Sequence, residues 1–162
     1  MSHVGTVIET ANAHSFCGIE PKFFLSLFQG RARTHDIEAM RAALRSHFQQ
    51  AAGKVVIMTV IGAGSTLGER GRKLISEMMK ELDPRVEAWG ICIEGKGLWG
   101  TTARAMTATT RLFSRTTHPF KVSSEAKETL QWLEQRCARP MPDNAMAMLE
   151  VMREKLAQLA KP

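Results

Sequence analysis

Apolar residues in this 162-residue chain recur at two different spacings, and the alternation predicts strands and helices in turn. A continuous β-branched run at Val55–Ile61 and an apolar run at Val86–Ile93 are typical of strands covered on both faces, as in a parallel sheet. The aromatic run Phe23–Phe28, between Pro21 and Gly30, predicts a further strand. A sheet with a buried centre follows from these three segments.

Weaker patterns complete the predicted architecture. Ala13–Ile19 is expected to pair with the aromatic strand as a hairpin across Glu20-Pro21, and Phe120–Val122 is expected to form a last strand. Apolar positions three and four residues apart predict helices at Asp36–Gln50, from Ser65 or Thr66 to Leu82, Thr101–Ser114 and Glu125–Arg136, and after Asp143-Asn144. Thr34 is expected to cap the first of these helices.

The order of these elements predicts an α/β fold, with a mixed, largely parallel sheet of four to five strands and crossover helices. A Pro-rich break at Arg139–Pro142 separates an extra C-terminal helix. The predicted organisation is a flexible segment at 1–12, the α/β domain at 13–137, and a linker with an amphipathic helix at 138–162. That helix is expected to pack on its own domain, and a homodimer through it is the alternative.

The chain is basic, with 22 Lys and Arg against 16 Asp and Glu, a net charge of +6. The basic residues are dispersed, and the densest cluster, Arg70–Lys73, holds three charges in four residues. No tyrosine is present, and aromatic and basic residues do not interleave as they do on RNA-binding sheets. The pattern indicates a solvated surface and no nucleic-acid partner.

The cellular compartment is predicted from the length of the apolar runs and from the number and spacing of the cysteines. The longest apolar run, Val55–Ile61, contains Thr59 and is far too short to span a bilayer, so no transmembrane segment is expected. No secretory signal is visible at the start of the chain. The three cysteines, Cys17, Cys92 and Cys137, are odd in number and have no paired spacing, which is typical of reduced thiols in a cytoplasmic protein.

A literal G-x-G-x-x-G stands at Gly95–Gly100, between a predicted strand and a predicted helix. In dinucleotide-binding folds such glycines let the backbone approach a pyrophosphate at the helix N-terminus. Here the motif follows a later strand than the fingerprint requires, and no acidic residue ends the next strand at Val122. No cofactor is therefore predicted.

The second glycine-rich turn, Gly62–Gly68, also joins a strand to a helix and fails as a P-loop, because neither register supplies G-K-[ST]. It presents the hydroxyls of Ser65 and Thr66 where a helix is expected to begin. Two interpretations stay open: Ser65 caps the helix, or one of the two hydroxyls is a phosphoacceptor beside an anion-binding turn.

Catalytic and metal signals are poor. No serine stands in G-x-S-x-G, and neither H-E-x-x-H nor C-x-x-C occurs. Paired metal spacing is absent from the five histidines, which are His3, His14, His35, His47 and His118. The sequence nominates no catalytic residue and no metal ligand, so an enzyme is not predicted.

Several strings resemble the SpoIIAA-like members of the STAS superfamily (sulfate transporter and anti-sigma factor antagonist domains). They are Ile91–Gly95 followed by Gly97-Leu98, Thr102–Met106, Pro119–Val122, and Ser124–Ala126 leading to Leu130–Leu133. The resemblance covers roughly residues 13–136. It implies a small non-enzymatic domain for protein–protein regulation, with a phosphorylated Ser or Thr at a helix N-terminus. Ser65 and Thr66 match that position, although Gly64 replaces the expected acidic residue and Leu67 the expected glycine.

Three functions therefore stay open. The first is a regulatory domain that binds a protein partner and is phosphoswitched at Ser65 or Thr66. The alternative, which the resemblance also implies, is a small-molecule or lipid carrier with a pocket near Gly95–Gly100; a nucleotide-using enzyme is a weak third. The expected anion- or partner-binding loops contribute Gly62, Gly64, Gly68, Gly95, Gly97 and Gly100.

Overall fold

The protein is described from a computed structural model, which covers residues 8–11, 14–97, 100–105 and 115–161. A six-stranded sheet forms its centre, in the order β1-β2-β3-β5-β7-β8. The first two pairings are antiparallel and the other three are parallel. The strands are β1 (Ile8–Ala11), β2 (His14–Glu20), β3 (Phe23–Phe28), β5 (Val55–Ile61), β7 (Val86–Ile93) and β8 (Phe120–Ser123).

Both central apolar runs form the strands that their composition predicts. β5 pairs in parallel with β7, and every residue of β5 except Ile61 is buried. Helices on both faces of the sheet exclude water from the side chains of both faces, which is why these strands are apolar except at Thr59 and Glu87. The predicted mixed, largely parallel α/β class is confirmed.

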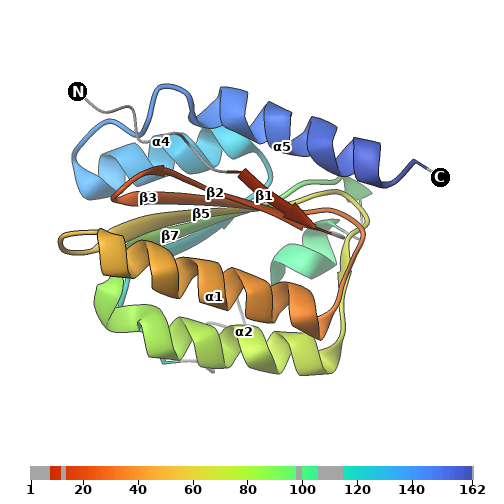
Figure 1. The fold of residues 1–162 in the computed structure, drawn as a ribbon, viewed down its shortest axis with the longest axis horizontal. Helices are drawn as coiled ribbons and strands as arrows, with labels where there is room; N and C mark the ends of the chain where they lie inside the picture. Colours follow the sequence, from red (N-terminus) through yellow and green to blue (C-terminus); the bar gives the residue numbers. More distant parts are fainter. Residues whose placement is uncertain (1–7, 12–13, 98–99, 106–114, 162) are drawn as a thin grey trace.

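Helices cover both faces of the sheet (Figure 1). α1 (Thr34–Gln50) and α2 (Glu69–Leu82) lie side by side on one face. α4 (Ala126–Cys137) packs over β7, and α5 (Ala145–Leu159) packs over β1, β2 and β3 on the opposite face. α5 buries Leu149, Met152 and Leu156 against the sheet, so the expected packing on its own domain is observed.

Two details differ from the sequence prediction, and one predicted helix is described only in part. The sheet has six strands because Ile8–Ala11, in the segment expected to be flexible, pairs with β2. This short polar segment has no periodicity of its own, and its backbone bonds come from the neighbouring strand. Arg33, and not Thr34, is the N-cap of α1, because its backbone N–H donates to Asp36 Oδ2 at 2.7 Å. Residues 100–105 are helical, and 106–114 lie outside the described residues.

Two short segments form a second, two-stranded parallel sheet. β4 (Arg31–Ala32) follows β3, and β6 (Thr66–Leu67) follows β5. They tie together the loops at the carboxyl ends of the two strands. In open α/β sheets this edge is where ligands bind.

Candidate functional site: an apolar cavity under two loops

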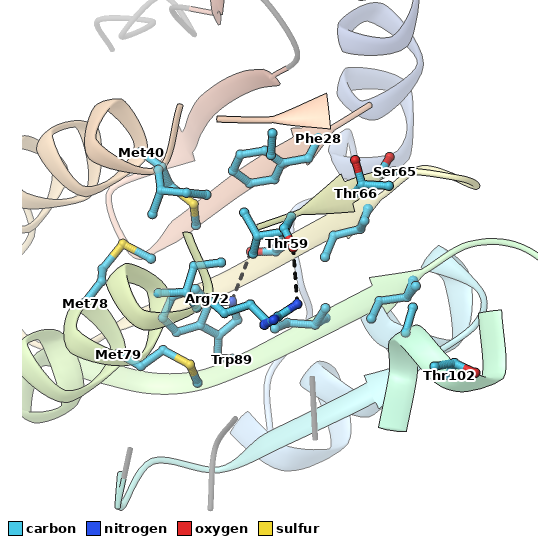
Figure 2. A pocket seen from close by; sticks show the side chains of 18 residues that line it. Phe28, Met40, Thr59, Ser65, Thr66, Arg72, Met78, Met79, Trp89 and Thr102 are labelled. Carbon is cyan, nitrogen blue, oxygen red and sulfur yellow. Dashed lines mark hydrogen bonds between the residues drawn. The ribbon is translucent and has the colours of Figure 1, made fainter. Parts of the chain in front are cut away.

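A cavity of about 320 Å³ lies between the sheet and the layer of α1 and α2 (Figure 2). It opens toward the carboxyl ends of β3, β5 and β7. Its lining comes from those strands, α1, α2, both short strands and the helix at 100–105: Phe28, Ala32, Ile37, Met40, Thr59, Ile61, Ser65, Thr66, Leu67, Arg72, Ile75, Met78, Met79, Trp89, Ile91, Ile93, Thr102 and Ala103.

The closed end of the cavity is built from flexible apolar side chains. Met40, Met78 and Met79 are each at most 2% exposed, and they come from the two helices. Methionine is unbranched and adapts its shape to what it contacts. The open end lies near Thr66 and Thr102, whose side chains are exposed. The cavity therefore runs from a mouth at the loops to an adaptable interior.

A hydrogen-bonded row crosses the sheet at the wall of the cavity. Ser26 Oγ in β3 donates to Thr59 Oγ1 in β5 at 2.9 Å, and Trp89 Nε1 in β7 donates to the same oxygen at 3.0 Å. All three side chains are buried, so the bonds satisfy groups that water does not reach. The row fixes the Trp89 ring as one wall of the cavity (Figure 2).

A second cluster supports the same ring from outside. His118 stacks on Trp89 with ring centroids 6.0 Å apart, and its Nδ1 lies 2.6 Å from Asp83 Oδ1. Asp83 also accepts bonds from the backbone N–H groups of Thr117 and His118, and from Thr117 Oγ1. Burial tends to raise the pKa of Asp83, but the bonds from His118 and Thr117 outweigh it and lower the pKa to about 2. The carboxylate therefore stays ionised and holds the His118 ring against the wall.

Ser65 and Thr66 lie at the mouth, three to four residues before a helix. α2 begins at Glu69 with Gly68 as N-cap, so the predicted start at Ser65 or Thr66 is wrong and Ser65 does not cap the helix. The β4–β6 pairing explains the difference, because it holds residues 66–67 extended. Thr66 N donates to Gly30 O at 3.0 Å, and Ser65 Oγ accepts from Gly30 N at 3.1 Å.

The two hydroxyls have different environments. Ser65 is buried and its oxygen is bonded to the backbone of the neighbouring loop, whereas Thr66 is exposed. The turn between them and β5 includes Gly64, at φ +74°, a conformation that side chains rarely adopt. Of the two predicted phosphoacceptors, only Thr66 presents its side chain to solvent. Phosphorylation itself stays a prediction.

At the second glycine turn, backbone carbonyl groups accept hydrogen bonds from the side chain of Arg104. Arg104 Nη1 donates to Ile93 O at 3.1 Å and to Gly95 O at 3.3 Å. A Cβ on Gly100 would come within 2.5 Å of Gly95 O, so glycine is required there for close backbone packing. The described glycines of this motif thus serve the turn and its contact with Arg104. Thr102 and Ala103, which follow, line the cavity.

Ser65, Thr66 and Leu67 of the first turn and Thr102 and Ala103 beyond the second border the same cavity, and the six glycines expected to bind an anion or a partner are not among its lining residues. The sequence interpretation missed the residues inside the cavity. Thr59 and Trp89 stand in apolar runs, where a hydroxyl and an indole signal nothing about their partners. Arg72 was noticed only as part of a basic cluster. His118, which the sequence analysis names only as a histidine without metal-ligand spacing, is 3% exposed. A buried histidine beside an aspartate is visible only after folding.

The described residues hold neither a metal-ligating cluster nor a helix able to cross a membrane. Over residues 8–11, 14–97, 100–105 and 115–161, no group of three or more His, Cys, Asp or Glu side chains is placed to hold a metal ion. No helix in the same ranges has the length and apolar character needed to cross a membrane. Cys17, Cys92 and Cys137 are free thiols, and burial raises their pKa values to about 11, 12 and 11.

Known structures support the fold. The chain is similar to the crystal structure of an uncharacterised protein of the DUF3478 family with a SpoIIAA-like fold, from Shewanella loihica PV-4. Sequence identity is 15%, the match covers 80% of this chain and 92% of that chain, and the TM-score is 0.52. No protein-family model and no curated protein matches the chain. The resemblance seen in the sequence is confirmed: the fold is SpoIIAA-like.

Proposed function

We propose that this SpoIIAA-like domain is a non-catalytic binding protein that takes up a small molecule with an apolar body. The observation that carries the proposal is the cavity of about 320 Å³, which lies in the size range of small-molecule sites and is lined mainly by apolar side chains. Such space inside a domain is costly when empty, because the side chains around it lose contacts. A ligand would restore those contacts.

The chemistry of the lining favours binding over catalysis. Arg72 is the only ionisable side chain among the described lining residues. The hydroxyl of Thr59 is engaged in the row with Ser26 and Trp89. A hydrolase or transferase would need a general base beside a nucleophile, and no described lining residue can act as that base.

We place the protein in a reducing, cytoplasmic setting because its three cysteines are free.

The experiment is a calorimetric titration with 1-decanol, an uncharged chain of suitable length. We expect saturable binding to the wild type and at least tenfold weaker binding to Ala32→Leu, which fills part of the cavity. Ile75→Phe is the second filling variant, and Ala39→Leu, on the exposed face of α1, is the matched control. Absence of saturable binding, or equal affinity in all four proteins, would contradict the proposal.

A second candidate function is regulated binding of a protein partner at the Gly62–Gly68 turn. The exposure of Ala63, Gly64 and Thr66 favours it, because these residues form a surface next to the cavity mouth. We propose Thr66 as the phosphoacceptor, since Ser65 is buried and bonded to Gly30. Peptide mapping of the protein isolated from its native cells tests this: phosphate on Thr66 supports it, and phosphate on Ser65 contradicts it.

A further inference from the structure

Arg72 extends from the first turn of α2 into the cavity. Figure 2 shows Arg72 among the side chains that line the cavity. The residue is half-buried, and Nη1 donates one long hydrogen bond, of 3.3 Å, to Leu67 O. A guanidinium carries five N–H donors, so most of its capacity is not used by this bond.

The charge of Arg72 is not balanced by a neighbouring acid. No carboxylate within the described ranges forms an ion pair with it, whereas Arg41, Arg45, Arg139 and Arg153 all have such partners. Arg72 is half-buried, so part of its hydration is lost without a counter-charge, which has a cost. The missing counter-charge is the main reason to expect an anion here.

The position of Arg72 in its helix strengthens this argument. It stands four residues into α2, after Gly68 as N-cap, and the exposed Arg70 and Lys73 flank it. The N-terminal turn of a helix carries partial positive charge, so three cations there destabilise the helix. A contribution to helix stability therefore does not explain why an arginine stands at position 72. Of these three cations, Arg72 alone lines the cavity.

The rest of the cavity matches an aliphatic chain. From Arg72 the lining continues to Ile75, Met78 and Met79 along α2, and this interior end is buried. A volume of about 320 Å³ corresponds to about ten groups of water size, at ~30 Å³ each. A medium-length chain would fill it, with its head at the mouth.

From these observations we infer that the cavity binds an aliphatic carboxylic acid, with the carboxylate on the guanidinium of Arg72 and the chain toward Met78 and Met79. A carboxylate carries the single charge that one arginine balances, and it can accept two parallel N–H bonds from the guanidinium. The inference rests on the proposed binding function and adds the chemistry of the ligand's head group.

The test compares decanoate with 1-decanol at neutral pH, by calorimetry on the full chain. We expect the wild type to bind decanoate more tightly than decanol. Arg72→Met keeps an unbranched side chain of similar length and removes the charge, so decanoate should weaken at least tenfold, while decanol changes less than threefold. Arg72→Lys should retain part of the decanoate affinity, because the charge remains.

Arg70→Met is the matched control, since it removes an equal charge from the same turn at an exposed position. It should change decanoate binding less than threefold. Equal decanoate affinity in wild type and Arg72→Met, with decanol still bound, would overturn the role of Arg72 and leave the proposed function intact. Loss of decanoate and decanol together in Arg72→Met would also overturn it. Failure of the wild type to bind either compound would overturn the proposed function as well.

Discussion

Replacing Thr59 by valine tests whether the buried row across β3, β5 and β7 holds the cavity wall. Valine has nearly the shape of threonine, so the packing of β5 is kept and the hydroxyl alone is lost. The change leaves two donors, Trp89 Nε1 and Ser26 Oγ, without the acceptor that lies 3.0 and 2.9 Å from them. The cavity wall would then contain unsatisfied polar groups.

The magnitude follows from those two donors. A buried donor without a partner costs about 1–3 kcal/mol, and the serine hydroxyl can rotate to another acceptor, so Thr59→Val should lower the free energy of unfolding by about 2–4 kcal/mol. Ser26→Ala removes one donor and should cost about 1 kcal/mol. The double variant should then be less destabilised than the sum of the two singles, by about 1 kcal/mol.

Urea denaturation, followed by circular dichroism, measures all three variants against the wild type. Unchanged slopes with shifted midpoints would show that only stability differs. A loss below about 0.5 kcal/mol for Thr59→Val, or strict additivity in the double variant, would refute a coupled row that is closed to water.

Three further predictions use the same structure. Ser65→Ala should destabilise the protein by about 1 kcal/mol, because it removes the hydrogen bond from the Gly30 N–H, while Thr66→Ala should change stability by less than about 0.5 kcal/mol; equal effects in urea would contradict this. Asp83→Asn should lower stability by about 2 kcal/mol at neutral pH. Because the lowered pKa of Asp83 makes its contribution present above about pH 4 and lost as pH falls toward 2, the difference from wild type should shrink over that window; a constant difference would count against it. The raised pKa values of Cys17 and Cys92 predict slow reaction with a disulfide reagent at pH 8 and fast reaction in urea; rapid modification of the folded protein would show that the thiols are accessible.

Much of the fold could be predicted because the mainly apolar composition of the central strands reflects their burial on both faces of the sheet. Val55–Ile61 and Val86–Ile93 were placed with the boundaries observed, since a strand buried on both faces must be apolar throughout. β1 was missed because its pairing comes from β2. The start of α2 was misplaced because a tertiary pairing, β4 with β6, overrides the local cap signal of Ser65.

The sequence predicted where the site lies, but not which residues contact one another inside it. Both glycine turns were recognised, and the cavity is bordered by residues 65–67 within the first turn and by Thr102 and Ala103 in the helix that follows the second. The contacts inside it join residues far apart in sequence: Thr59 lies 33 positions from Ser26 and 30 from Trp89. No local pattern encodes such pairs. The role of Arg72 depends likewise on which way the first turn of α2 faces.

The central claim is that the space between α1, α2 and the sheet is a ligand cavity with Arg72 at its mouth. A crystal structure with 10-bromodecanoate tests it most directly, because anomalous scattering locates the bromine atom. We predict one bromine position beside Met78 and Met79, with the carboxylate within hydrogen-bonding distance of the Arg72 guanidinium. A crystal in which the methionine side chains fill the space and no bromine lies among them would contradict the account.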